Sequence, residues 1–285
     1  GDARVVPADG FEHGRGAAVG LVGVAGREVK HGPDLVHGQR RMNAERVFDP
    51  AVKDVGLAGQ LGKPASAKAA TTLLTRRTDA LIADKGPTRA AMTYGDAEVP
   101  PVLRMRRGVP FALRLENGLD EPTTVHWHGL RIDNRMDGVP FLTQPYVYGG
   151  DGFDYAFTPP DAGTFWYHPH CNTLEQMGRG LAGVIVVEDP ADPVFDAEIV
   201  LNLRDWRLGG DGQFIAQFKP RDAARAGTFG TVRTANWRQT PQYDAPAGGL
   251  VRLRIAATDV TRILTLNVDG ADALVIAADG LGVRS

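Results

Sequence analysis

Thr124-Val-His-Trp-His-Gly-Leu130 places two histidines on either side of one tryptophan. Side chains alternate across an extended strand, so His126 and His128 point to one face while Trp127 points to the opposite face. Trp127 can therefore anchor the strand in a hydrophobic core while the two imidazoles lie side by side. This short segment predicts a β-strand whose one face carries a pair of nitrogen ligands.

Gly163-Thr-Phe-Trp-Tyr-His-Pro-His170 contains a second pair with the same spacing, His168 and His170. Pro169 cannot donate a ladder hydrogen bond, which predicts that this pair lies at the end or the edge of a strand. Neutral imidazole binds copper, zinc, iron and nickel, so four imidazoles from two neighbouring strands could hold one metal ion or part of a cluster. The alternative is that both pairs are structural residues of ordinary strands. Two pairs near strand ends favour metal binding.

Strand patterns continue on both sides of the histidines. Apolar and polar residues alternate over 111–116 and 153–157, and 184–187 is a short apolar run. The same alternation recurs further along the chain, over 199–204, 251–255 and 264–269. Short strands separated by turn residues, in a chain with 35 glycines and 19 prolines, predict an all-β protein built from β-sandwiches.

Three regions follow from these patterns. Residues 1–67 are rich in Gly, Ala, Arg and Asp, show little periodicity and are interpreted as an irregular, poorly ordered leader. Residues 68–192 form a first domain that carries both histidine pairs. Asp189-Pro-Ala-Asp-Pro193 is typical of a linker, and residues 196–285 form a second domain without a histidine.

The composition argues against several classes of function. The formal net charge of -2, with charges mixed along the chain, does not predict binding to nucleic acid or to an acidic membrane. No stretch approaches the roughly 18–20 apolar residues of a membrane span. A single cysteine, Cys171, excludes a disulfide within the chain.

Both histidine segments resemble the two amino-terminal copper motifs of the multicopper oxidases, the laccase-like family. Met136-Asp-Gly-Val-Pro-Phe-Leu-Thr-Gln144 resembles the segment that connects those motifs, and Gly180-Leu-Ala-Gly183 also fits the pattern. The order and spacing of these blocks match, and the resemblance extends from about residue 70 to the end of the chain. It implies tandem cupredoxin-like Greek-key β-sandwiches, of which the second is incomplete here.

The resemblance also implies a copper-dependent oxidoreductase that couples one-electron oxidation of a substrate to four-electron reduction of dioxygen to water. On this sequence, His126 would bind the type 2 copper of a trinuclear cluster, and His128, His168 and His170 would bind the type 3 pair. Asp137 resembles the family's acid beside the cluster, which donates protons or orients water. The alternative for Asp137 is a turn aspartate in the common Asp-Gly pair.

The family pattern is only partly present. The family's trinuclear cluster uses eight histidine ligands, and this chain offers four. No histidine follows His170 in this chain. A type 1 site needs a cysteine with two histidines, so Cys171 is interpreted as a bystander thiol and the type 1 site as absent. His13, His31 and His37 fit no ligand spacing. We therefore expect a partial chain that is inactive by itself, and the pattern favours a three-domain parent over a two-domain laccase.

Three hypotheses remain open: a copper oxidase, a copper-binding cupredoxin protein without turnover, and a structural β-sandwich. For the first, the expected partners are dioxygen and a small reducing substrate, either phenol-like or a metal ion. The resemblance implies a periplasmic or secreted location, although the sequence shows no clear signal peptide.

Overall fold

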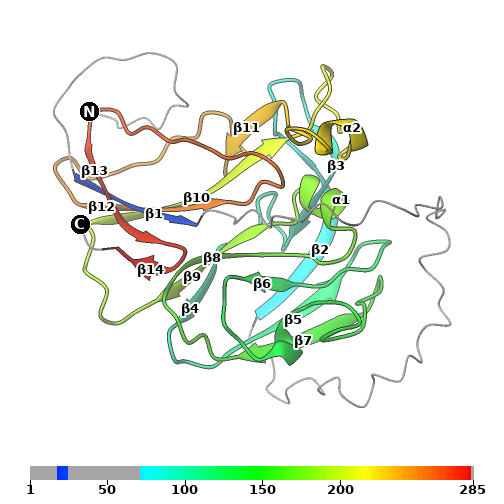
Figure 1. Cartoon of the computed structure of the whole chain (residues 1–285), viewed down its shortest axis with the longest axis horizontal. Coiled ribbons are helices and arrows are strands. Elements are labelled where there is room, and N and C mark those ends of the chain that lie inside the picture. Colours follow the sequence, from blue (N-terminus) through cyan, green and yellow to red (C-terminus); the bar gives the residue numbers. More distant parts are fainter. Residues whose placement is uncertain (1–17, 25–70, 284–285) are drawn as a thin grey trace.

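The structure is a computed structural model that describes residues 18–24 and 71–283. The regular secondary structure of the described residues is mainly β-strand (Figure 1), with short helical segments between the strands. These segments are the α-helices α1 (Thr173–Gly178) and α2 (Pro220–Ala223) and the 3-10 helix η3 (Asn134–Met136). The prediction of an all-β protein is confirmed. No described helix is long and apolar enough to cross a lipid bilayer.

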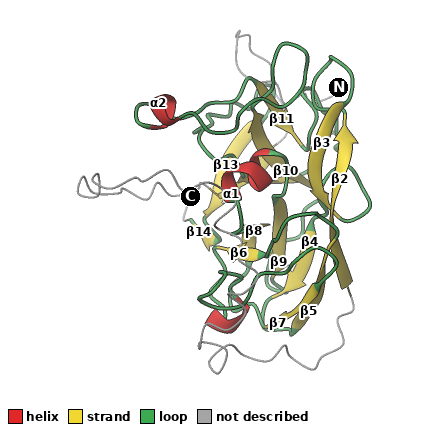
Figure 2. Ribbon diagram, turned by 90° about the vertical axis from the view of Figure 1, so that its right-hand side faces the viewer, coloured by secondary structure: helices red, strands yellow, loops and turns green. Residues whose placement is uncertain are grey.

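Two four-stranded sheets form a β-sandwich that contains both histidine pairs. The first sheet consists, in order, of β3 (Thr88–Tyr94), β2 (Thr71–Ala80), β5 (Phe111–Asn117) and β7 (Gly152–Phe157). The second consists of β4 (Leu103–Arg106), β9 (Gly183–Glu188), β8 (Gly163–His168) and β6 (His126–His128). Figure 2 shows the sandwich from the side.

One hydrophobic core fills the space between these sheets. Leu113 and Leu115 of β5 are fully buried, as their alternation with polar residues predicts, and they share this core with Ile185 and Val187 of β9. Trp127 of β6 is also fully buried, and its ring meets that of Tyr155 edge-on at 5.2 Å. Its Nε1 donates to the carbonyl of Met136 at 3.0 Å, so the indole is both packed and hydrogen-bonded.

A six-stranded mixed sheet adjoins the sandwich. Its strands, in order, are β11 (Val232–Ala235), β10 (Ala197–Trp206), β12 (Val251–Ala257), β1 (Ala18–Val24), β13 (Asp272–Ala278) and β14 (Leu281–Gly282). β1 runs parallel to both β12 and β13. A stretch near the start of the chain therefore completes a sheet built mostly from its last ninety residues, as Figure 1 shows in blue between orange and red strands.

Apolar and ionic contacts join this sheet to the sandwich. Ile82 and Ala91 pack in one cluster with Trp206 and Trp237. Arg254 of β12 pairs with Glu198 at 2.6 Å and donates to the Thr164 hydroxyl of β8 at 3.2 Å. The strand that carries His168 is thus held from outside the sandwich as well as from within.

Two expectations differ from the structure. The irregular leader is wrong for residues 18–24, which form β1, because their backbone finds partners on both sides; the remaining residues of 1–67 lie outside the described residues. The alternating segment 264–268 is a loop and not a strand. Leu264 packs against the core of the six-stranded sheet, but Leu266 stays 40% exposed. The alternation therefore corresponds to one packing contact and not to a hydrogen-bonded strand.

Candidate metal centre

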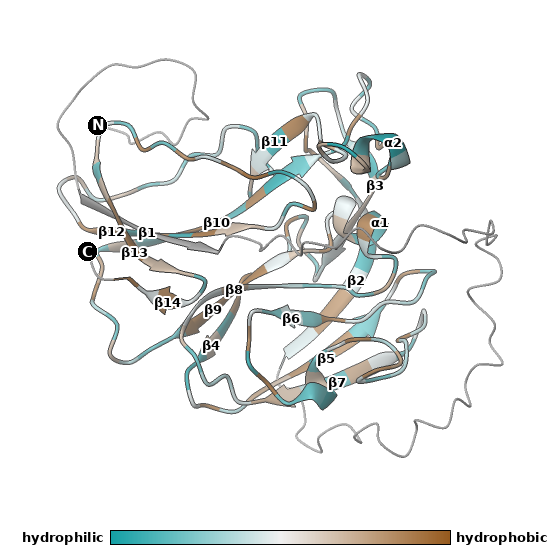
Figure 3. Ribbon diagram, viewed as in Figure 1, coloured by the Kyte–Doolittle hydropathy of each residue, from teal (hydrophilic) through white to brown (hydrophobic). Residues whose placement is uncertain are grey.

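The two histidine pairs lie opposite each other in one antiparallel ladder. His126 faces His168, and His128 faces Trp166. Trp127 faces Tyr167, and both are fully buried on the core side. The remaining positions turn to the other face. Figure 3 colours β6 as hydrophilic and β9, which is separated from it by β8, as hydrophobic.

The four imidazoles gather into one cluster. The ring centroid of His126 lies 4.6 Å from that of His170 and 5.2 Å from that of His168. His128 lies 5.5 Å from His168 and 5.7 Å from His126. The structure thus brings together all four histidines that the sequence singles out. The second pair lies at a strand end, as Pro169 predicts, because β8 ends at His168.

The nitrogen atoms are spaced as ligands of shared metal ions would be. Nδ1 of His128 lies 3.3 Å from Nε2 of His168. One nitrogen from each of His126, His168 and His170 lies within 4.8 Å of the others. Since a metal–imidazole bond is about 2.0 Å long, two nitrogens on one ion can be at most about 4 Å apart. The His128–His168 distance fits one ion, and the group of three fits neighbouring ions.

Backbone carbonyls select the tautomer of two of these rings. Nδ1 of His126 donates to the carbonyl oxygen of Asp137 at 2.8 Å, and Nδ1 of His168 donates to that of Pro169 at 3.0 Å. A carbonyl can only accept, so the proton must be on Nδ1 in both rings and the lone pair on Nε2. Both rings are thereby oriented with a free Nε2 toward the cluster, an arrangement typical of metal-binding histidines.

Burial favours the neutral form of three of the four rings, those of His128, His168 and His170. Burial lowers the pKa of His128 to about 4 and lowers the pKa of His168 well below its ordinary value; repulsion from His126 acts in the same direction. Burial also lowers the pKa of His170. Neutral imidazole is the form that binds metal ions, so these rings are ready as ligands at neutral pH.

Asp137 lies at the edge of the cluster, directly after η3. Its carboxylate Oδ1 is 3.3 Å from Nδ1 of His126, farther than its own carbonyl oxygen. Gly138 follows with a φ of +78°, and a Cβ at this position would lie 1.8 Å from the carbonyl oxygen of Val125. Only glycine fits there, and this close approach holds Asp137 beside His126.

Trp166 is a residue of the site that the sequence reasoning did not identify. Its ring stacks at 28° on His128, at 4.4 Å, and on His168, at 4.3 Å. It is 6% exposed, and its Nε1 has no hydrogen-bond partner among the described residues. The signal was present in the sequence, since Trp166 is two residues before His168 and therefore shares its face.

Cys171 is buried beside the cluster but outside the set of nitrogen ligands. Burial raises the pKa of its thiol to about 12. A thiol in that state is protonated at neutral pH and is a poor metal ligand. This supports the interpretation of Cys171 as a bystander.

Comparisons with known proteins agree with the geometry. Residues 76–192 match the family model for multicopper oxidases. The multicopper oxidase MmcO of Mycobacterium tuberculosis is 39% identical over 153 residues, which are 53% of this chain and 30% of that protein. Laccase-5 of Trametes villosa is 31% identical over 69% of this chain and 40% of its own length.

Solved structures give the same result. The multi-copper oxidase of Pseudomonas thermotolerans superposes with a TM-score of 0.65 and 42% identity over 68% of this chain and 48% of that protein. The chain spans less than half the length of these relatives. The sandwich, its cupredoxin-like relatives and the matched segment lead to one conclusion: the chain belongs to the multicopper oxidase family and corresponds to part of such a protein.

Proposed function

We propose that His126, His128, His168 and His170 are half of the ligand set of a trinuclear copper site. In this proposal His126 binds the type 2 copper and the other three bind the type 3 pair. The observation that carries the proposal is the convergence of four imidazoles, with Nδ1 of His128 and Nε2 of His168 3.3 Å apart. We further propose that the whole protein couples one-electron oxidation of a small reducing substrate to reduction of dioxygen to water.

The donor set fits copper. Imidazole nitrogen is a favoured ligand for copper, and the described cluster offers no thiolate that would select a softer site. Bound copper would supply the electrons for reducing dioxygen. The carbonyls of Asp137 and Pro169 orient the rings of His126 and His168, and Trp166 stacks on the rings of His128 and His168.

Asp137 is proposed to move protons or to orient water during that reduction. Its side chain is 29% exposed, and its Oδ1 lies 3.3 Å from Nδ1 of His126, so it reaches both solvent and the ring of His126. Reduction of dioxygen to water consumes protons, and a carboxylate in this position can deliver them.

A copper-binding protein without turnover is the second candidate. It is supported within this chain by Cys171, which lies beside the cluster as a protonated thiol and not as a thiolate ligand. We propose that this chain alone lacks a type 1 site and does not consume oxygen. The full-length protein, in this proposal, does consume oxygen. The proposed reducing substrate is phenol-like or a metal ion, and the proposed location is periplasmic or secreted.

The test uses the full-length protein that contains this chain. Each of the four histidines is replaced by alanine in turn, and copper content and oxygen consumption are measured. Each variant should lose copper and oxygen consumption, while His31→Ala, a histidine outside the proposed set, should keep both. Oxygen consumption near the wild-type rate in any of the four variants removes that residue from the ligand set. Full copper without oxygen consumption in the wild-type protein favours the binding protein.

A further inference from the structure

His170 differs from the other three histidines in what holds it. His126, His128 and His168 are ladder residues of β6 and β8, whose backbones are fixed by strand pairing. His170 lies two residues beyond the end of β8 and is exposed. Its ring is nevertheless 4.6 Å from that of His126 and 5.4 Å from that of His168. Something other than the sheet must therefore hold His170 against the cluster.

The backbone of His170 is tied to the segment before the first histidine pair. Its N–H donates to the hydroxyl of Thr124 at 3.2 Å. Thr124 is fully buried and lies two residues before His126. This hydrogen bond joins the two ligand segments directly, 46 residues apart in the sequence.

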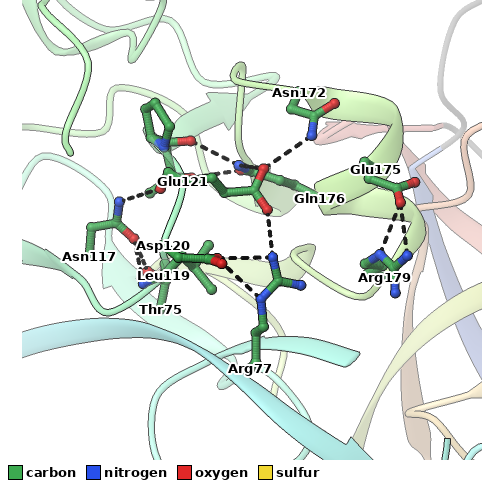
Figure 4. Close-up of polar contacts among 12 residues, drawn as sticks. Thr75, Arg77, Asn117, Leu119, Asp120, Glu121, Asn172, Glu175, Gln176 and Arg179 are labelled. Carbon is green, nitrogen blue, oxygen red and sulfur yellow. Dashed lines mark hydrogen bonds and ion pairs between the residues drawn. The ribbon is translucent and has the colours of Figure 1, made fainter. Parts of the chain in front are cut away.

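Gln176 makes the second connection, from the first turn of α1. Its side chain is fully buried and every polar atom on it is bonded. Its Oε1 accepts from the hydroxyl of Thr123 at 2.9 Å, and its Nε2 donates to the carbonyl of Pro122 at 2.9 Å and to Glu121 Oε2 at 3.2 Å. Figure 4 shows Gln176 reaching across to Glu121.

Glu121 completes the connection and anchors it. Its Oε2 also accepts from Nδ2 of Asn172 at 3.0 Å, and its Oε1 pairs with Arg77 of β2 at 2.9 Å (Figure 4). Asn172 has a left-handed backbone, with a φ of 41°, and its carbonyl accepts from the N–H groups of Glu175 and Gln176 at 3.0 Å. The turn that follows His170 is thus held in a strained conformation by contacts with the loop 121–124.

We propose that Glu121 and Gln176 are positioning residues of the copper site. Together with Thr123, Thr124 and Asn172 they form a clasp, which sets the position of His170 relative to His126. The proposal rests on the proposed function, since it takes His170 to be a copper ligand. Thr123, Thr124 and Gln176 are buried and hydrogen-bonded, and such satisfied polar groups hold a single geometry. Residues that orient metal ligands control metal affinity without touching the ion.

Copper affinity of the full-length protein tests the clasp. Gln176→Met keeps the length of the side chain and removes three hydrogen bonds, and Glu121→Gln keeps the shape and removes the charge. Both variants should bind copper about 10-fold to 100-fold more weakly than the wild type, the range found for residues that orient metal ligands. Both should also change the electron paramagnetic resonance spectrum of the copper that remains. Chelator competition measures the affinity.

Asn202→Leu is the matched control. Asn202 is 3% exposed, donates to the carbonyl of Ala182 and accepts from the hydroxyl of Thr258, the same bond types that Gln176 makes. It bonds to none of the clasp residues. Asn202→Leu should lower the melting temperature of the metal-free protein as Gln176→Met does, yet keep the wild-type copper affinity and spectrum.

The outcomes separate the clasp from the proposed function. If Gln176→Met and Glu121→Gln keep the wild-type copper affinity and spectrum, the proposed positioning role of the clasp is wrong. It is also wrong if Asn202→Leu loses as much copper affinity as the clasp variants do. If Gln176→Met does not fold, Glu121→Gln decides by the same criteria. Full copper content in His170→Ala overturns the ligand assignment of the proposed function itself, whatever the clasp variants do.

Discussion

Nδ1 of His128 lies 3.3 Å from Nε2 of His168, across the ladder from β6 to β8. The carbonyl of Pro169 holds the proton of His168 on Nδ1, so its Nε2 presents a lone pair to His128. In the metal-free protein His128 can donate to that lone pair. In the copper-loaded protein one ion would take the place of the shared proton.

This arrangement predicts that the two histidines act as a unit. Either His128→Ala or His168→Ala alone should lower copper affinity more than about 10-fold, because a direct ligand counts for at least as much as an orienting residue. The double variant should be little worse than either single one, since the same ion is lost. Chelator competition on the full-length protein gives the three values. Losses that simply add would show that the two rings serve different ions.

The second prediction concerns acid. Burial lowers the pKa of His128 from 6.5 to about 4, and His168 and His170 shift in the same direction. Below pH 6.5 these histidines bind protons in the unfolded chain but stay neutral in the folded protein. The free energy of unfolding of the metal-free protein should therefore fall as the pH drops from 6.5 toward 4. Urea unfolding at pH 7 and pH 5 measures the loss. His128→Gln should make it smaller, and an unchanged loss would contradict the assigned cause.

The third prediction concerns Gly138. A Cβ at this position would lie 1.8 Å from the carbonyl oxygen of Val125, on a backbone with a φ of +78°. Gly138→Ala should lower the free energy of unfolding by about 4 kcal/mol or more, the size of a severe steric and backbone defect. Gly150→Ala is the control, because Gly150 also has a positive φ but nothing lies within 4 Å of its Cβ position. It should cost only about 1 kcal/mol. Urea unfolding compares them, and similar costs would refute the close contact.

The fourth prediction concerns Asp137. Asp137→Asn keeps the backbone carbonyl that orients His126, so copper content should stay full. Oxygen consumption of the full-length protein should fall about 100-fold if the carboxylate supplies protons. Asp133→Asn is the control, since Asp133 is a nearby exposed acid that pairs with Arg135. Equal rates of oxygen consumption in Asp137→Asn and Asp133→Asn would show that Asp137 is only a structural turn residue.

The fifth prediction concerns Cys171. Its buried, protonated thiol should not bind copper, so the copper-loaded chain should lack the intense absorption of a copper–thiolate bond. Cys171→Ala should leave copper content unchanged and lower stability by about 1 kcal/mol, as small buried truncations do. Visible absorption spectra of the copper-loaded wild-type chain and of Cys171→Ala test this prediction. A blue colour that disappears with the thiol would make Cys171 a ligand.

Several strands were predictable from local pattern alone. β5 follows the alternation of Leu113 and Leu115 with polar residues, and β9 follows the apolar run 184–187. The segment 264–268 shows the limit of this reasoning, because it alternates equally well but finds no neighbouring strand within the described residues. A strand is stabilised by the neighbouring strands with which it pairs, and the local alternation of residues does not specify those neighbours.

The sequence by itself determined the chemistry of the site: four imidazoles in two pairs, each pair on one face, with Trp127 on the other. The physical reason is that the two-residue period of a strand is a local property of the backbone. Only the tertiary structure decided that His126 faces His168, and that Glu121 and Gln176 hold the turn after His170. Register and loop contacts join residues forty or more positions apart, and they depend on how whole sheets and loops pack, which no short segment specifies.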